Sequence, residues 1–179
     1  MDFATTLKFA HVLAAVLWVG GGFTTIIAGI VLSGRSTPQT QLAIVQAVVL
    51  LAPRLFIPAS ILTLASGVTL LFVAGWGWQP FTVLGLAGVI FTAGFGALVL
   101  GPSCERALKL ADTHGAEAAI PSLRRVQRLA MMDYAVQFVI VFLMVVKPSW
   151  SDFAVFGGIG AIIALAALAA LRPVHRVTI

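Results

Sequence analysis

The sequence predicts an all-α protein: a polytopic transmembrane helical bundle with about five spans and one interfacial helix, in a single domain over residues 1–179. Hydrophobic residues make up 60% of the chain and charged residues only 9%, whereas about a quarter of the residues in a soluble protein are charged. Apolar stretches recur that are long enough to cross the hydrocarbon core of a bilayer, which takes roughly 20 helical residues. These stretches account for most of the chain, so we expect the protein to be embedded in the lipid bilayer and to have no separate soluble domain.

The N-terminal half predicts two spans and the interfacial helix. The first span covers about residues 5–33 and ends at a run of turn-forming residues over 34–38. The apolar segment 39–52 contains three glutamines and is short for a span, which favours an interfacial helix. The second span, about 55–74, has Pro58 in its first turn, where a missing N–H does little harm.

The C-terminal half predicts three spans. A turn rich in glycine and tryptophan over 75–80 precedes the third span, about 81–104, and a helical extension as far as Lys109 stays open. The hydrophilic segment 105–128 carries eight of the 17 charged residues and is predicted to be a loop. The remaining helices are expected at about 126–146 and 153–171.

Basic residues divide unevenly between the two sides of a five-span bundle. Lys8 and Lys147 lie on the side of the N-terminus, and all the others lie on the opposite side. Because cytoplasmic loops collect Lys and Arg, this split predicts an N-out, C-in orientation, and it explains the net charge of +5 without a nucleic-acid partner. Trp76, Trp78 and Trp150 then fall at the outer interface, as an aromatic belt. The inner basic residues are Arg35, Arg54, Arg106, Lys109, Arg124, Arg125, Arg128, Arg172 and Arg176.

Several motifs of enzyme chemistry are absent from the sequence. Cys104 is the single cysteine, which excludes an intrachain disulfide and an iron–sulfur cluster held by one chain. There is no pair of histidines four residues apart, no Gly-x-Ser-x-Gly and no phosphate-binding glycine loop. The sequence therefore gives no support to a hydrolase, a zinc protease or a nucleotide-driven protein, and it leaves open whether the chain is an enzyme.

His11 is the only histidine inside any of the membrane-length apolar runs. An ionisable side chain there costs a few kcal/mol, so it marks a candidate functional site with a partner to be found. On a helix, His11 shares a face with small residues and with Trp18 and Gly22, which leaves room for a porphyrin plane or a neighbouring helix. The simpler alternative is a hydrogen bond from His11 to a backbone carbonyl or a Ser or Thr hydroxyl of another helix.

The end of helix 126–146 meets the layer of His11, because the two helices run in opposite directions. At about 1.5 Å per residue, His11 lies roughly 9 Å and Met144 about 6 Å below the outer surface, with Lys147 at the boundary. Histidine and methionine are a known axial pair for haem, and a lysine at the water line can pair with a propionate. The alternatives are core packing for Met144 and snorkelling for Lys147.

Asp133 is an acidic residue in the inner half of helix 126–146, with Gln137 one turn later on the same face. A carboxyl group in this position suggests either a proton-accepting site or a structural hydrogen bond. The favoured alternative is a buried ion pair with Arg54 or Arg128 that fixes the packing of the helices.

The string LKFAH at residues 7–11, followed by WVGG at 18–21, resembles the opening helix of a group of small bacterial membrane proteins. The group includes the membrane-haem type of protoporphyrinogen oxidase, the copper-resistance D domain and an uncharacterised set of predicted integral membrane proteins, to which the resemblance is closest. It covers about residues 5–148. In the haem-binding oxidases the histidine of the first helix is linked to haem, which the resemblance implies for His11. The lysine that those oxidases carry early in the third helix has no counterpart in residues 81–89.

These residues leave three functions open. The leading hypothesis is a b-type haem protein of the bacterial inner membrane, which binds haem through His11 and takes part in electron transfer or in oxidation of a small substrate, with a redox partner in the membrane. The second is a copper-binding or copper-transport protein with His11 and Met144 as ligands. The third is a cofactor-free accessory subunit whose glycine-rich faces pack against a larger membrane complex or a second copy of the chain.

Overall fold

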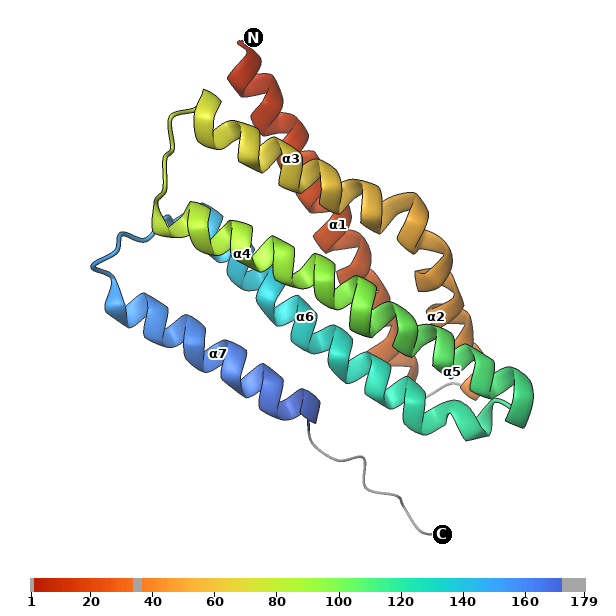
Figure 1. The fold of residues 1–179 in the computed structure, drawn as a ribbon. Helices are drawn as coiled ribbons and strands as arrows, with labels where there is room; N and C mark the ends of the chain where they lie inside the picture. The colour runs from red at the N-terminus through yellow and green to blue at the C-terminus, as the bar shows by residue number, and fades with distance from the viewer. Residues whose placement is uncertain (1, 34–36, 172–179) are drawn as a thin grey trace.

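The computed structural model describes residues 2–33 and 37–171, and every regular element in these ranges is a helix. Five continuous helices are long and apolar enough to cross a membrane, and they pack side by side as a bundle (Figure 1). They are Phe3–Leu32, Pro38–Val73, Pro80–His114, Glu117–Val146 and Phe153–Leu171. The predicted all-α bundle with five spans is therefore confirmed.

The first and last helices have nearly the bounds that the sequence predicts. Helix α1, Phe3–Ser33, packs mainly along the second span, whereas α7, Phe153–Leu171, lies at the edge of the bundle against the fourth span (Figure 1). Asp2 caps the start of α1, since its Oδ1 accepts the backbone N–H of Thr5 at 2.7 Å. Hydrogen bonding from Thr5 lowers the pKa of Asp2. An ionised side chain thus lies at the N-terminal end of the first span.

The second span is one bent helix of 36 residues rather than two separate helices. Its parts are α2, Pro38–Leu51, a π-helical turn, Ala52–Phe56, and α3, Ile57–Val73. Pro53 has no N–H to continue the α-helical hydrogen bonds, and the wider π turn accommodates it without ending the helix. The segment expected as a separate interfacial helix is instead continuous with the second span, and its buried Leu42 and Val45 pack against the third and fourth spans.

The hydrophilic loop predicted over residues 105–128 is instead a tight helical hairpin. One helix runs through α4, Pro80–Phe95, a π-helical turn, Gly96–Leu100, and α5, Gly101–His114. Gly115, at a φ of 88°, turns the chain, and after a short 3-10 turn helix α6 covers Ile120–Val146. Both arms are amphipathic, because Ala107 and Leu123 are buried between the helices while the charged Lys109 is exposed. This alternation holds the charged segment in helices.

The two ends of the bundle differ in composition. The end that carries the N-terminus also carries the α3–α4 and α6–α7 turns, with Trp76, Trp78 and Trp150 (Figure 1). We call it the outer end. The opposite end holds the α5–α6 hairpin, whose buried side chains form a cluster with α2 around Cys104. These three tryptophans thus lie at one end, as the sequence predicts, and the N-out orientation stays a prediction.

Candidate functional site

His11 is held in one orientation by two groups on α3. Its Nδ1 lies 2.9 Å from the backbone oxygen of Thr63 and 3.0 Å from Ser66 Oγ. A carbonyl oxygen can only accept a hydrogen bond, so Nδ1 carries a proton and donates it. Ser66 directs its own hydroxyl hydrogen to backbone oxygens of α3 and therefore also accepts from His11. The hydrogen bond between helices that the sequence offers as the simpler alternative for His11 is thus present.

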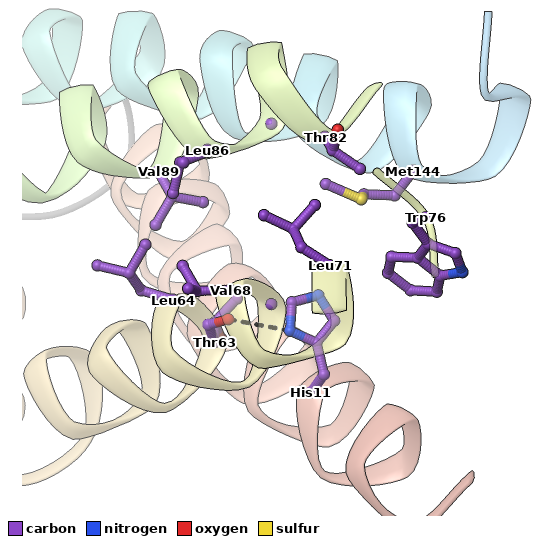
Figure 2. Close-up of a pocket in the computed structure, with 12 residues that line it drawn as sticks. His11, Thr63, Leu64, Val68, Leu71, Trp76, Thr82, Leu86, Val89 and Met144 are labelled. Carbon is purple, nitrogen blue, oxygen red and sulfur yellow. Dashed lines mark hydrogen bonds between the residues drawn. The ribbon is translucent and has the colours of Figure 1, made fainter. Parts of the chain in front are cut away.

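The second ring nitrogen of His11, Nε2, remains available. In a neutral imidazole whose Nδ1–H donates, the lone pair resides on Nε2. Figure 2 shows this nitrogen on the side of the ring that faces Leu71 and Met144. Metal-ligating histidines commonly donate from one ring nitrogen to a backbone carbonyl and bind metal with the other. The hydrogen bond to Thr63 is therefore compatible with a ligand role as well as with a purely structural one.

A cleft lies beside His11, between α3 and α4, with α1, α6 and the α3–α4 turn completing its walls. Met144 projects into the cleft from α6, so the structure brings together the two residues that the sequence predicts at one depth (Figure 2). Thr63 and Thr82 are the other polar residues of the lining, and both hydroxyls donate to nearby backbone oxygens. The rest of the wall is apolar and includes the side chains of Leu64, Val68, Leu71, Leu86 and Val89.

Two glycines make room for His11 and Met144. A Cβ atom on Gly67 of α3 would lie 3.0 Å from His11 Cε1, which is closer than ordinary van der Waals contact. A Cβ atom on Gly85 of α4 would collide with the terminal methyl group of Met144. A larger residue at either position would therefore require His11 or Met144 to shift.

Two lysines flank the outer end of the cleft. Trp76 lines the cleft, and the ammonium groups of Lys8 and Lys147 lie 5.9 and 5.4 Å from its ring centroid, within the range of cation–π contact. Lys147 also lies 5.5 Å from the ring centroid of Phe81. Its backbone is left-handed, with a φ of 50°, and this conformation ends α6 beside the cleft. The two outer basic residues of the sequence thus converge on one tryptophan.

The cleft is narrow. It encloses about 410 Å³ of space out to its open side, but the centre of a water molecule can move through only about 40 Å³ of it. About 10–15 Å³ suffices for one water, whereas pockets for organic ligands measure roughly 300–1,000 Å³. The conformation described by the structure therefore has room for a few waters, and a larger ligand requires its walls to part.

Trp18 does not line the cleft. It is buried one layer deeper, where it packs with Ala59 and Val89. The room that the sequence predicts beside Gly22 is filled by the Tyr134 ring of α6, whose hydroxyl occupies the position that a Cβ atom on Gly22 would take. The face of α1 below His11 therefore packs against a neighbouring helix, which was one of the two occupants expected for it.

Asp133 is buried and is not joined to Arg54. Its Oδ2 accepts a hydrogen bond of 2.7 Å from Gln137 Nε2, and its Oδ1 has no hydrogen-bond partner within the described residues. Arg54 is exposed and donates to the backbone oxygen of Leu50. Arg128 is partly buried on α6. The ion pair with Arg54 is thus replaced by a pair of polar side chains on one helix.

Four residues of the site were not predicted from the sequence: Lys8, Trp76, Thr63 and Ser66. Lys8 and Trp76 could have been predicted, because both belong to the same outer layer as Lys147. The hydrogen bond between His11 and Thr63 could not, since any backbone carbonyl on a neighbouring helix could have accepted it. No group of three or more His, Cys, Asp or Glu side chains suited to a metal occurs in residues 2–33 and 37–171, so a metal at His11 would rely on Met144 or exogenous ligands.

The fold and the cleft define a multi-pass membrane protein with a histidine and a methionine facing one apolar cleft. A family model described as "Predicted integral membrane protein (DUF2269)" matches residues 5–148, and the chain belongs to this family. The match supports the uncharacterised set in the sequence resemblance, not a relationship to the haem oxidase or the copper-resistance domain. No curated protein and no solved structure gives a significant match. The matched region includes His11, Met144 and both lysines, and it ends before α7.

Proposed function

We propose that the protein binds b-type haem in the bacterial inner membrane and takes part in electron transfer with a membrane redox partner or in oxidation of a small substrate. The observation that carries the proposal is the orientation of His11, whose Nδ1 is engaged by Thr63 and whose Nε2 faces the cleft. A histidine nitrogen is a common axial ligand of haem iron. Its hydrogen bond to a carbonyl fixes the ring and raises the basicity of the free nitrogen.

Three further side chains in or beside the cleft could interact with haem. Met144 offers a thioether on the wall opposite His11 and can serve as a second, weaker ligand. Lys8 and Lys147 at the outer end can pair with two propionates. Haem supplies reversible one-electron transfer when bound. The chain supplies the imidazole of His11, apolar walls that exclude water, and the positive charges of Lys8 and Lys147 at the outer end of the cleft.

The width of the cleft sets a condition on this function. Leu71 projects into the space between His11 and Met144, and its side chain must turn away before a macrocycle can enter (Figure 2). The adjoining parts of α3 and α4 must also move apart. The turn that connects these two helices contains Gly75 and Gly77, both at positive φ.

A visible spectrum tests the proposal. The protein would be expressed with ample haem, purified in detergent and compared with His11→Ala and with His114→Ala, which removes an exposed histidine far from the cleft. We expect a Soret band in the wild type and in His114→Ala and none in His11→Ala. A wild-type protein that stays colourless would overturn the haem proposal.

Copper is the second candidate, and the shared cleft of His11 and Met144 is the observation that favours it, because imidazole and thioether suit copper. Metal analysis of the same preparations separates the two candidates. Stoichiometric copper without a Soret band, lost in both His11→Ala and Met144→Ala, would support this candidate. If the preparations contain neither haem nor copper, the remaining hypothesis is a cofactor-free accessory subunit, in which His11 only joins α1 to α3.

A further inference from the structure

Two buried oxygen atoms in the middle of α6 lack the hydrogen that each of them needs. Among the buried side-chain atoms of residues 2–33 and 37–171, only Asp133 Oδ1 and Gln137 Oε1 have no hydrogen-bond partner. Asp133 is 4% and Gln137 3% exposed, so water has little access to either residue. An unpartnered polar atom at such a place costs about 1–3 kcal/mol, and an uncompensated charge costs more.

The two orphan oxygens belong to side chains that are already joined. Gln137 Nε2 donates to Asp133 Oδ2 at 2.7 Å, as expected for residues four apart on a helix. The two oxygens without a partner are the second carboxyl oxygen of Asp133 and the amide oxygen of Gln137, and neither carries a hydrogen when the acid is ionised. A proton on Asp133 Oδ1 that is donated to Gln137 Oε1 would satisfy both.

The surroundings of Asp133 offer no evident counter-ion. The segments of α1, α2, α4 and α7 that pack against α6 carry no charged side chain apart from Lys8, which lies at the outer end on Trp76. The charged residues of α5, including Lys109, lie in the inner hairpin and are exposed. On α6 itself, Arg128 lies five residues before Asp133 and so about 140° around the helix. Tyr134 directs its hydroxyl to the Trp18 backbone oxygen.

The depth of Asp133 in the membrane also favours the protonated acid. Asp133 lies 13 residues before Val146, which is about 20 Å along a helix, whereas the hydrocarbon core of a bilayer is about 30 Å thick. A carboxylate at this depth, without a paired cation, is disfavoured relative to the neutral acid. We propose that Asp133 holds a proton at neutral pH and forms a closed acid–amide pair with Gln137, a proton-binding site on the buried face of α6.

Infrared spectroscopy reads this proton directly. The wild-type protein, with aspartate labelled by ¹³C at the side-chain carboxyl, should show a protonated-carboxyl band at pH 7 that shifts with the label. The other aspartates of the chain, Asp2, Asp112 and Asp152, are exposed and contribute carboxylate bands. The band should vanish in Asp133→Asn and persist in the matched control Asp112→Asn. A wild-type spectrum with carboxylate bands alone would overturn the proposal.

Thermal stability gives a second, independent measurement. Asn at residue 133 supplies the N–H that the proton provides, so Asp133→Asn should keep or raise the unfolding midpoint. Asp133→Leu leaves the Gln137 amide without a partner and should lower the midpoint by at least about 4 °C. A clear loss of stability in Asp133→Asn, or stability that depends on sodium or another cation in place of the acid band, would contradict the proton site. This inference does not depend on haem binding, because both measurements are made without cofactor.

Discussion

Gly85 of α4 lies against Met144 of α6 so closely that a single added methyl group would occupy the space of the methionine methyl. We expect Gly85→Ala to push Met144 out of its place in the cleft and to destabilise the protein by up to about 1 kcal/mol, at the low end of overpacking costs, because the displaced methyl group is the flexible end of a side chain that borders the cleft. Shortening Met144 to Ala in the same chain should recover much of this loss. A double-mutant cycle of unfolding free energies measures the coupling.

Gly94 is the matched control for this prediction. It lies on the same helix, and a Cβ atom there would meet nothing within 4 Å. Gly94→Ala should therefore be neutral or stabilise the helix by about 0.5–1 kcal/mol. Equal destabilisation at both positions would mean that the contact with Met144 carries no special cost.

His11→Ala should abolish haem binding while leaving membrane insertion intact, because alanine is a good helix former and removes a polar group from the apolar layer. Met144→Ala should only weaken binding or shift the spectrum, since iron with one histidine ligand remains five-coordinate. Ser66→Ala should retain haem, because the Thr63 backbone oxygen still orients Nδ1. Absorption spectra and haem content per protein give the readout, and haem retained in His11→Ala would remove this residue from the site.

Lys8→Gln and Lys147→Gln should each weaken the binding of haem about two- to fivefold, the range expected for one exposed ion pair, and the effect should shrink at high salt. The ammonium groups lie beside Trp76 at the outer end of the cleft, where they could pair with the propionates of haem. Lys109→Gln, on the exposed face of the inner hairpin, is the control and should leave affinity unchanged. Titrations with the dimethyl ester of haem, which lacks the two charges, should show no effect of either outer lysine.

Leu71→Ala should open the cleft between His11 and Met144. Leu71 is 7% exposed, so its truncation should cost about 2–5 kcal/mol of stability in the protein without cofactor. It should at the same time raise the rate or the extent of haem loading, because less side chain has to move. A variant that loses stability and also loses haem while His11 stays in place would show that Leu71 supports the bound state instead.

A reporter at each end of the chain tests the orientation. A fusion after Ile179 should behave as cytoplasmic and one at the N-terminus as periplasmic, because most Lys and Arg residues lie on the side of the bundle opposite the N-terminus. Both reporters on one side of the membrane would mean that one of the five long helices does not span it.

The fold was largely predictable because each span carries its own signal. Residues 153–171 were expected as a helix and are one, since their apolar run is bounded by polar residues on both sides. The charged hairpin was missed although Ala107 and Ala111 follow each other at helical spacing, because charge density alone suggested a loop. The continuity of the second span through Pro53 was harder to foresee, since a proline ends most helices and only the wider π turn allows it to remain.

The depth of the site residues in the bundle could be predicted from the sequence, whereas most of the residues that contact them could not. Counting the helical rise placed His11 and Met144 in one layer, and both line the cleft. The room beside Gly22 could not be assigned, because the sequence does not reveal which helix faces it, and Tyr134 fills it. An arginine partner for Asp133 was a reasonable expectation for a buried acid, but the chain provides an amide one turn away instead.

The two π-helical turns separate the cleft from the buried cluster at the inner end of the bundle. Ala52–Phe56 and Gly96–Leu100 interrupt the second and third spans, inward of the cleft. Beyond them, α2, α5 and the start of α6 share one buried cluster, while the segments of α3 and α4 that line the cleft are joined to each other by a glycine-containing turn. A small change of helix direction at either π turn would shift the cleft-lining part of that span, together with the helix packed against it, relative to the inner cluster.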